Sequence, residues 1–347
     1  MDLFALTKKL IDIPSVTGEE KAAGEFLSAL LESLGYKVER QELERDRFNV
    51  FATTSARPRV VLSTHMDTVP PYIAASEDAD VIYGRGACDA KGIIAAQITA
   101  AEQLRAEGVN EIGLLFTVDE EAGSEGARVA DANPLASQCE YLINGEPTDN
   151  KLASATKGSL RLTLTAKGRS AHSAYPEQGE SAIEKLLDVL QDLRHCQWPS
   201  DELLGETTCN IGVISGGTRA NVIPGEASAV LQLRLVNDAD SVKSILEQVV
   251  AGRAAVEYLS VHSPVRLFTV DGFDQCVVRF TTDIPYLSRW GKPLLIGPGS
   301  IFQAHTEGEY VSKRELRDAV TLYTGLTRSL LSTANQRAGQ VVEGALR

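Results

Sequence analysis

Two histidines and three carboxylates of this chain have the chemistry to bind divalent metal ions. Most of them come within three residues of the end of a short apolar run: His65 follows residues 60–62, and Glu146 follows residues 141–143. Neutral imidazoles and ionised carboxylates are common metal ligands, and a bridging carboxylate can hold a metal pair that activates water. The candidate ligands are His65, Asp89, Glu121, Glu146 and His305. This set predicts metal-assisted amide hydrolysis.

Two aspartates have different expected roles at such a site. Asp89 lies in segment 84–92, where glycines let the backbone approach closely, so we expect it to bridge the two metals. Asp67 lies two residues after His65, and we expect its carboxylate to accept the second imidazole N–H and orient the ring. The alternative for Asp67 is a loop-capping aspartate.

Adjacent glutamates, Glu120 and Glu121, end the apolar segment at 112–118. Consecutive side chains of an extended backbone point in opposite directions, so we expect only one glutamate to bind metal. The other, for which Glu120 is the candidate, would face a metal-bound water with a pKa lowered toward ~7. It would then take the proton of that water as a general base. The alternative is a solvated acidic pair at a strand end.

Apolar runs alternate with helical periodicity in the first part of the chain. The motif Thr17-Gly18-Glu19-Glu20 is a capping box that predicts the start of a helix. Strands are expected at 37–43, 47–53, 60–63, 112–118 and 141–143, with a further helix at 91–107. This order predicts an α/β catalytic domain with a central mixed sheet flanked by helices. Ligands of such sheets bind at the carboxyl ends of the strands.

The pattern changes near residue 158, after which residues 160–165 alternate between apolar and polar. The next expected elements are a helix at 180–194, strands at 208–214 and 226–236, a helix at 239–251 and a strand at 255–261. This β-α-β-β-α-β order predicts an inserted ferredoxin-like α+β domain. The α/β pattern returns with a strand at 293–296 and a helix at 312–331. We expect a catalytic domain at 1–157 and 265–334, an inserted domain at 158–264 and a C-terminal tail at 335–347.

Composition narrows the function class. The chain has 347 residues and a formal net charge of −13, which argues against nucleic acid as a partner. Its five cysteines have no Cys-x-x-Cys spacing, which favours a reduced cytosolic compartment. We expect no membrane association, because no run approaches the ~20 apolar residues that span a bilayer. The expected location is therefore the cytoplasm.

At this point the motifs resemble the M20 metallopeptidase family, in the branch of acetylornithine deacetylase and succinyl-diaminopimelate desuccinylase. The matching segments are His65-Met66-Asp67-Thr68-Val69-Pro70, Gly84-Arg85-Gly86-Ala87-Cys88-Asp89-Ala90-Lys91-Gly92, Asp119-Glu120-Glu121, Gly145-Glu146-Pro147-Thr148, Gly168-Arg169-Ser170-Ala171-His172, Asn221-Val222-Ile223-Pro224 and Ala304-His305. They occur in the family's order and cover nearly the whole chain.

The resemblance implies a role for each site residue. One metal would be held by His65, Asp89 and Glu146, and the other by Asp89, Glu121 and His305. Glu120 would act as general base and then as proton donor to the leaving amine. The metals would be two zinc ions, with cobalt or manganese as alternatives. The resemblance also implies a cis peptide bond at Asp89-Ala90.

His172 has a separate implied role. As a lone loop histidine it would more often be structural or exposed, but the resemblance makes it the group that polarises the scissile carbonyl and stabilises the oxyanion. In family members that dimerise through the inserted domain, this histidine comes from the partner subunit. The resemblance thus implies a homodimer and an inserted dimerisation or lid domain.

The substrate-binding residues follow from the same resemblance and from loop chemistry. Lys157 matches a basic position of the branch, and Asn221 and Arg234 match positions that bind the substrate's carboxylate. Gly299 could expose a backbone N–H to an anion, although glycine-proline loops are usually turns. The branch usually has aspartate and proline where this chain has Gln232 and Leu235.

The predicted function is removal of the N-acyl group from a small N-acyl amino acid. Acetyl is the first candidate for this group. N-acetylornithine is the first candidate, which would place the chain in arginine biosynthesis. The alternatives are deacetylation of N-acetyl-lysine or N-acetyl-citrulline, desuccinylation of succinyl-diaminopimelate, and dipeptidase or carboxypeptidase activity. An inactive binding module is the alternative from a different class.

Overall fold

The computed structural model describes residues 2–345, except for the side chains of Arg45 and of residues 333–345. The chain forms two compact units. Unit 1 comprises Met1–Ser154, Leu267–Cys276 and Thr282–Arg347, and unit 2 comprises Ala155–Arg266 and Val277–Thr281. The inserted domain predicted at 158–264 lies within unit 2, whereas the return of Val277–Thr281 to this unit has no signal in the sequence. The predicted residue boundaries remain predictions.

Unit 1 is built on a six-stranded mixed sheet in the order β1-β2-β6-β3-β7-β17. Its strands are β1 (Lys37–Glu42), β2 (Phe48–Thr53), β3 (Val60–His65), β6 (Ile112–Thr117), β7 (Tyr141–Asn144) and β17 (Lys292–Leu295). β6, β3, β7 and β17 are parallel, β2 pairs antiparallel with β6, and β1 pairs antiparallel with β2. Every residue of β3 and β6 is buried, as expected of central parallel strands.

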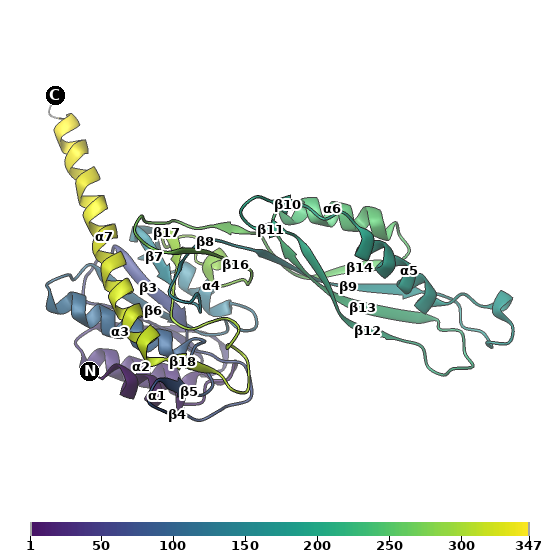
Figure 1. Cartoon of the computed structure of the whole chain (residues 1–347), viewed down its shortest axis with the longest axis horizontal. Coiled ribbons are helices and arrows are strands. Elements are labelled where there is room, and N and C mark those ends of the chain that lie inside the picture. Colours follow the sequence, from purple (N-terminus) through teal and green to yellow (C-terminus); the bar gives the residue numbers. More distant parts are fainter. Residues whose placement is uncertain (1, 346–347) are drawn as a thin grey trace. The chain divides into compact units, whose positions relative to one another are not determined.

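Helices cover both faces of this sheet. They are α1 (Leu3–Ile11), α2 (Lys21–Ser33), α3 (Lys91–Ala106), α4 (Glu125–Asp131) and α7 (Lys313–Ala345). Alternate strand residues take opposite faces: Leu62 lies in the core formed with α2, α3 and α7, and Val61 packs in a second core with Ala127 of α4 and Trp290. Figure 1 shows α3 and α7 side by side over the sheet. The predicted fold class is therefore confirmed for unit 1.

Several short elements lie outside the main sheets of the two units. A three-stranded sheet in the order β18-β5-β4 contains β4 (Ser76–Glu77), β5 (Val81–Tyr83) and β18 (Tyr310–Ser312). The 3-10 helices η1 (Glu44–Asp46), η2 (Ala136–Gln138) and η4 (Ile284–Tyr286) lie in loops. β8 (Leu152–Thr156), β15 (Val265–Arg266) and β16 (Gln275–Val278) form a further small sheet, where the chain passes from one unit to the other.

Two local predictions differ from the structure. The capping box does not form, because α2 begins at Lys21 and its N-cap, Glu20, makes no side-chain cap. The hydroxyl of Thr17 instead donates to Oδ2 of Asp67 at 2.9 Å, since a bridge between Val16 and Thr68 brings these loops together. At the other end of the chain, α7 extends beyond the predicted helix end at 331, through residues for which a tail was predicted. Residues 346–347 of that tail lie outside the described residues.

Unit 2 contains a four-stranded antiparallel sheet in the order β12-β13-β9-β14. The elements, in chain order, are β9 (Gly158–Lys167), η3 (Pro176–Gln178), α5 (Ala182–His195), β10 (Ser200–Asp201), β11 (Gly205–Glu206), β12 (Thr208–Gly216), β13 (Glu226–Leu235), α6 (Ala239–Val250) and β14 (Ala255–His262). Both helices lie on one face of the sheet (Figure 1), where a leucine-rich core is buried. The β-α-β-β-α-β order and this strand order confirm the ferredoxin-like prediction.

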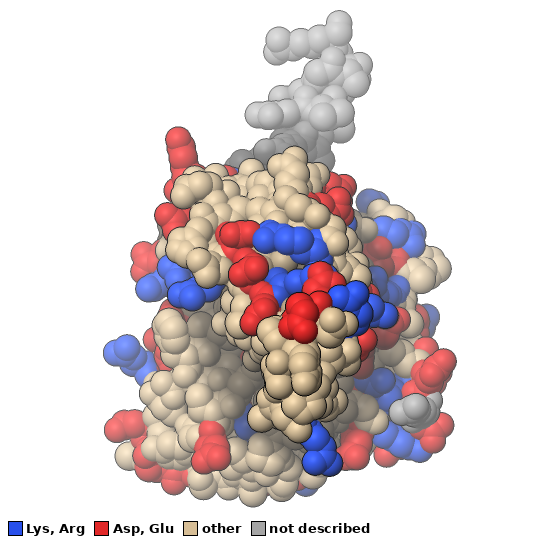
Figure 2. Space-filling model, turned by 90° about the vertical axis from the view of Figure 1, so that its right-hand side faces the viewer, with Lys and Arg blue, Asp and Glu red and all other residues tan. Residues whose placement is uncertain are grey.

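Figure 2 shows Lys and Arg interspersed with Asp and Glu on one face, without a continuous basic surface there. Among residues 2–345, no helix combines the length and the apolar composition needed to cross a membrane.

Candidate metal centre

Three parallel strands of unit 1 bring the candidate ligands to one edge of the sheet. His65 ends β3 and pairs in register with Thr117, the last residue of β6. Glu120 and Glu121 follow β6 after a turn at Asp119, whose positive φ of 71° reverses the backbone. Glu146 lies two residues after β7, which pairs with β3 on its other side. The predicted placement after strand ends is thus how the fold assembles the site.

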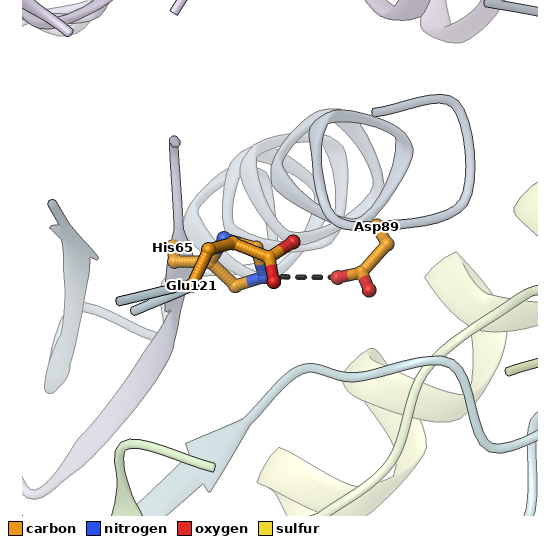
Figure 3. Close-up of side chains that lie close together, drawn as sticks. All are labelled: His65, Asp89 and Glu121. Atoms are coloured by element: carbon orange, nitrogen blue, oxygen red, sulfur yellow. Dashed lines mark hydrogen bonds and ion pairs between the residues drawn. The ribbon is translucent and has the colours of Figure 1, made fainter. Parts of the chain in front are cut away.

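His65 and Asp89 form the buried part of the centre. Nε2 of His65 lies 2.9 Å from Oδ1 of Asp89, which projects from the loop at the start of α3 (Figure 3). The peptide bond that follows Asp89 is cis, as the resemblance implies. Ligand atoms of His65, Asp89 and Glu121 all lie within 4.8 Å of one another. This spacing would let one cation contact all three groups.

His305 joins the same cluster from the far end of the sequence. Its Nε2 lies 2.8 Å from Oε1 of Glu121 and 3.3 Å from Oδ2 of Asp89. His305 adopts a positive φ of 66°, which is uncommon outside glycine but in which Asn, Asp and His are enriched, at the loop position that aims its ring. Asp89 therefore contacts both histidines through different oxygens, which is the geometry required of a bridging ligand.

Asp67 organises the glutamates as well as the imidazole. Nδ1 of His65 lies 3.0 Å from the backbone oxygen of Asp67 and 3.5 Å from its Oδ1. The backbone oxygen is therefore the nearer partner, in place of the expected carboxylate. The carboxylate instead accepts the backbone N–H groups of Glu120 at 3.1 Å and Glu121 at 3.2 Å. Asp67 thus fixes the turn that presents both glutamates.

Glu146 and Glu120 place further negative charge at the centre. Glu146 is buried, and its Oε1 has no hydrogen-bond partner among the described residues. Burial raises the pKa of Glu146, and burial together with the charge of Glu146 raises the pKa of Glu120. A buried carboxylate oxygen without a partner needs a cation or a proton to offset its desolvation.

The excess of carboxylates raises the pKa of both histidines. Hydrogen bonds with Asp89 and Glu121 raise the pKa of His305 to about 10. Burial alone would lower the pKa of His65, but its hydrogen bonds with Asp67 and Asp89 raise it. A proton on each imidazole thus offsets the surrounding negative charge. Divalent cations would offset this charge more effectively. The donor set and the partnerless oxygen of Glu146 therefore fit a metal centre.

The remaining predicted residues are Gly299, in unit 1, and four residues of unit 2. His172, Asn221, Lys157 and Arg234 belong to unit 2. His172 is exposed, and its Nδ1 accepts the N–H of Ala174 at 3.2 Å. A side chain at Gly299 would come within 2.9 Å of Cβ of Cys88, so this glycine permits close packing beside the Asp89 loop.

A buried aspartate near the centre was not predicted. Asp283 precedes η4, and its Oδ2 accepts the hydroxyl of Thr117 at 2.8 Å. Burial raises the pKa of Asp283 to about 6, and its charge in turn contributes to raising the pKa of Glu120 and Glu146. The only sequence signal was an acidic residue directly before Ile284-Pro285, which is also typical of an ordinary turn.

Comparison with known proteins identifies the family. Residues 154–256 match the model of the peptidase dimerisation domain, and residues 49–192 match that of peptidase family M28. An M20 peptidase domain-containing protein of Schizosaccharomyces pombe is 38% identical over 333 residues, which cover 93% of this chain and 83% of that protein. A probable carboxypeptidase of Aspergillus terreus is 37% identical, with 93% of this chain and 85% of that protein covered.

Solved structures share the fold at lower identity. The aminopeptidase PepT of Bacillus cereus superposes with a TM-score of 0.76 at 20% identity, over 93% of this chain and 96% of that one. An M20 family metallo-carboxypeptidase of Sulfolobus solfataricus gives 0.75 at 18% identity, over 93% and 98% of the two chains. Together with the sequence relatives, these comparisons show that the chain belongs to the M20 peptidase family, whose members hydrolyse amide bonds.

Proposed function

We propose that this chain is a two-metal amidohydrolase that cleaves the amide bond on the amino side of an amino acid with a free carboxylate. The observation that carries the proposal is the contact of Asp89 with both His65 and His305. A carboxylate placed between two imidazoles is suited to bridge two cations. A solved peptidase of Bacillus subtilis with a TM-score of 0.70 is described as binding a dinuclear metal, which supports the same arrangement.

The ligands divide into two sets that share Asp89. His65, Asp89 and Glu146 would hold one ion, and Asp89, Glu121 and His305 the other. When bound, two divalent ions supply polarisation of the amide carbonyl and a nucleophile at neutral pH. Zinc is our first assignment, with cobalt and manganese as alternatives, because carboxylate-rich sites with few histidines accept all three.

Glu120 is the proton carrier of this proposal. Its pKa is raised by burial and by Glu146, so it can hold a proton at a pH where an exposed glutamate cannot. We assign it the transfer of a proton from the attacking water to the leaving amine. Raised basicity suits both halves of that transfer, because the carboxylate must first accept the proton and then release it.

The oxyanion would be stabilised by His172, which we assign to the partner subunit of a homodimer. The supporting observations are the exposure of His172 and the match of unit 2 to the peptidase dimerisation domain. Edge strand β12 also exposes Val213 and Ile214, which are 56% and 55% accessible. Exposed apolar residues on an open strand edge are suited to pairing with a second copy.

The cations of unit 2 support our assignment of an anionic substrate. Arg234 on β13 is half-buried and forms no ion pair among the described side chains. Burial lowers its pKa, and the charge of nearby Arg161 lowers it further. Gln232 stands where an acidic residue would neutralise this pair, and its amide bonds Arg161 at 3.1 Å and Ser159 at 2.6 Å. A substrate carboxylate could pair with Arg234, and Lys157 and Asn221 stay assigned to the same role.

Within this class, N-acetylornithine remains the first candidate, which would place the chain in arginine biosynthesis, and carboxypeptidase or dipeptidase activity is the second. The second is favoured by the description of several fungal relatives as probable carboxypeptidases. Both reactions break an amide bond next to an amino acid whose carboxylate is free. They differ in the group on the other side of the bond.

The test is release of primary amine from a substrate panel by zinc-loaded protein, with a chelator control. The panel contains N-acetylornithine, N-acetyl-lysine, N-acetyl-citrulline, N-succinyl-diaminopimelate and dipeptides. Chelator-sensitive turnover of one N-acyl amino acid would establish the deacylase assignment, and turnover of dipeptides alone would establish the peptidase assignment. Turnover that persists after removal of all metal would contradict the proposal.

A further inference from the structure

A buried glutamate outside the ligand set holds the loop that carries Asp89. Glu309 lies directly before β18 and is 1% exposed. Its Oε1 accepts the backbone N–H groups of Gly86 at 3.0 Å, Cys88 at 3.1 Å and Asp89 at 3.1 Å. Backbone N–H groups of neighbouring residues that converge on one oxygen resemble an anion-binding nest. Here the anion in the nest is a side chain of the protein itself.

The other oxygen of Glu309 accepts a hydrogen bond from Arg85, which also contacts the loop that carries His305. Nη1 of Arg85 donates to Oε2 of Glu309 at 2.6 Å and to the backbone oxygen of Thr306 at 3.1 Å. Thr306 directly follows His305 in the sequence. Arg85 is 2% exposed, and its Nε donates to the backbone oxygen of Pro71 at 3.3 Å. This guanidinium therefore ties the loop of Asp89 to the loop of His305.

These contacts leave Glu309 no capacity for a metal ion. Oε1 already accepts three N–H groups, and Oε2 accepts the guanidinium. The backbone oxygen of Glu309 also accepts the N–H of Gly84 at 3.0 Å. The main chain and the side chain of Glu309 therefore both bind the loop that carries Asp89. The position of Asp89 thus depends on a carboxylate that does not touch the cation site.

We propose that Arg85 and Glu309 form a positioning pair that sets the placement of Asp89 against His305, and so determines whether the centre binds its second metal ion. The inference rests on the proposed two-metal function. Hydrogen-bond partners one shell beyond a metal typically change metal affinity by 10- to 100-fold when they are removed. The pair acts on the ion held by Asp89, Glu121 and His305, because only that ion needs both loops.

The experiment compares Glu309→Gln and Arg85→Lys with the wild-type chain. Zinc stoichiometry and affinity are measured by competition with a chromophoric chelator, and the visible spectrum of the cobalt-loaded protein reports ligand geometry. We expect both variants to bind the second ion 10- to 100-fold more weakly and to show an altered cobalt spectrum. The first ion, which His65 and Glu146 also hold, should be affected much less.

Glu140→Gln is the matched control for loss of an ion pair. Glu140 binds Arg59 at 2.7 Å and 3.2 Å, at the opposite ends of β3 and β7 from the metal centre. The Glu140→Gln variant should have a lower melting temperature, with the zinc affinity and the cobalt spectrum of the wild type. If Glu309→Gln fails to fold, Arg85→Lys decides the question, since it keeps the positive charge and loses the forked contacts.

The outcomes separate this inference from the function on which it rests. A wild-type chain that binds no metal pair would refute the proposed function and the inference together. A wild-type chain that binds two ions, with the same affinity and spectrum in every folded variant, would refute the positioning pair alone.

Discussion

Nε2 of His305 lies 3.3 Å from Oδ2 of Asp89, although unit 2 separates the two residues in the sequence. Asp89 also contacts His65, and His305 is the only histidine that follows unit 2 in the sequence. Its exposed fraction of 47% also makes His305 the accessible member of the cluster, whereas Asp89 is almost fully buried. The ion that depends on His305 should therefore be the one that exchanges more readily.

His305→Ala should reduce the zinc stoichiometry from two ions to one, because it removes the nitrogen ligand of one of the two sites. The measurement is metal content after dialysis against a defined concentration of free zinc. His195→Ala is the matched control, since His195 is an exposed histidine of α5 whose Nδ1 lies 2.8 Å from the backbone oxygen of Gln191, away from every candidate ligand in the sequence. Retention of both ions in His305→Ala would contradict its assignment as a ligand.

Glu120→Gln should lower kcat by a factor of about 10² to 10⁴, the usual contribution of a positioned proton carrier. Zinc content should remain that of the wild type, because Glu120 is assigned to neither ligand set. Glu125→Gln, an exposed position early in α4, serves as the control and should keep full activity. Activity that survives Glu120→Gln would show that another group transfers the proton.

Zinc affinity should rise with pH across the neutral range. The pKa of His305 is raised to about 10 in the metal-free protein, so at pH 7 its imidazole is protonated and must lose the proton to bind zinc. Each displaced proton makes the affinity increase about tenfold per pH unit below that pKa. Calorimetry in buffers of different ionisation enthalpy measures the protons released. His305→Ala should release about one proton fewer per chain.

Asp283→Asn should stabilise the metal-free protein at neutral pH. The pKa of Asp283 is raised from 3.8 to about 6 on folding, so its ionisation opposes folding. This cost is absent below about pH 4, develops between pH 4 and 6, and is complete above that range. The expected gain from the substitution is about 2–3 kcal/mol above pH 7 and near zero at pH 4. Denaturant unfolding at both pH values measures it, and an equal effect at both would contradict the assigned cause.

Substitution of Val213 and Ile214 by aspartate should convert a homodimer into a monomer, because it places charge on the exposed edge strand β12. Light scattering after size-exclusion chromatography measures the mass. Leu259→Asp is the control, since Leu259 is 49% exposed on β14, the opposite edge of the same sheet. If that control alone dissociates the dimer, the interface lies at β14.

Much of the fold could be predicted because its signals are local. The buried strands β3, β6 and β7 are short apolar runs, and β9 and β13 alternate between buried and more exposed positions. The capping box failed for a different reason. Thr17 has the right residue type and spacing, but its hydroxyl binds Asp67, a partner that local sequence does not specify.

The residues of the site likewise include some with a local signal in the sequence and some without one. His65, Glu121 and Glu146 were predictable because they follow recognisable strands, whereas Asp283 and Glu309 are single acidic residues in irregular segments. The structure gives them meaning only through distant partners: the Thr117 hydroxyl for Asp283, and Arg85 and backbone N–H groups for Glu309. Long-range pairing of this kind has no periodicity for a sequence to display.

The position of unit 2 within unit 1 also sets an order of assembly during translation. His65, Asp89, Glu121 and Glu146 leave the ribosome before any of unit 2, whereas His305 follows it. A nascent chain therefore carries one candidate histidine ligand and three candidate carboxylates from residue 146 until residue 305 is added. The second candidate imidazole is added only after all of unit 2, so the proposed two-metal centre can be completed only after the domain proposed for dimerisation has been made.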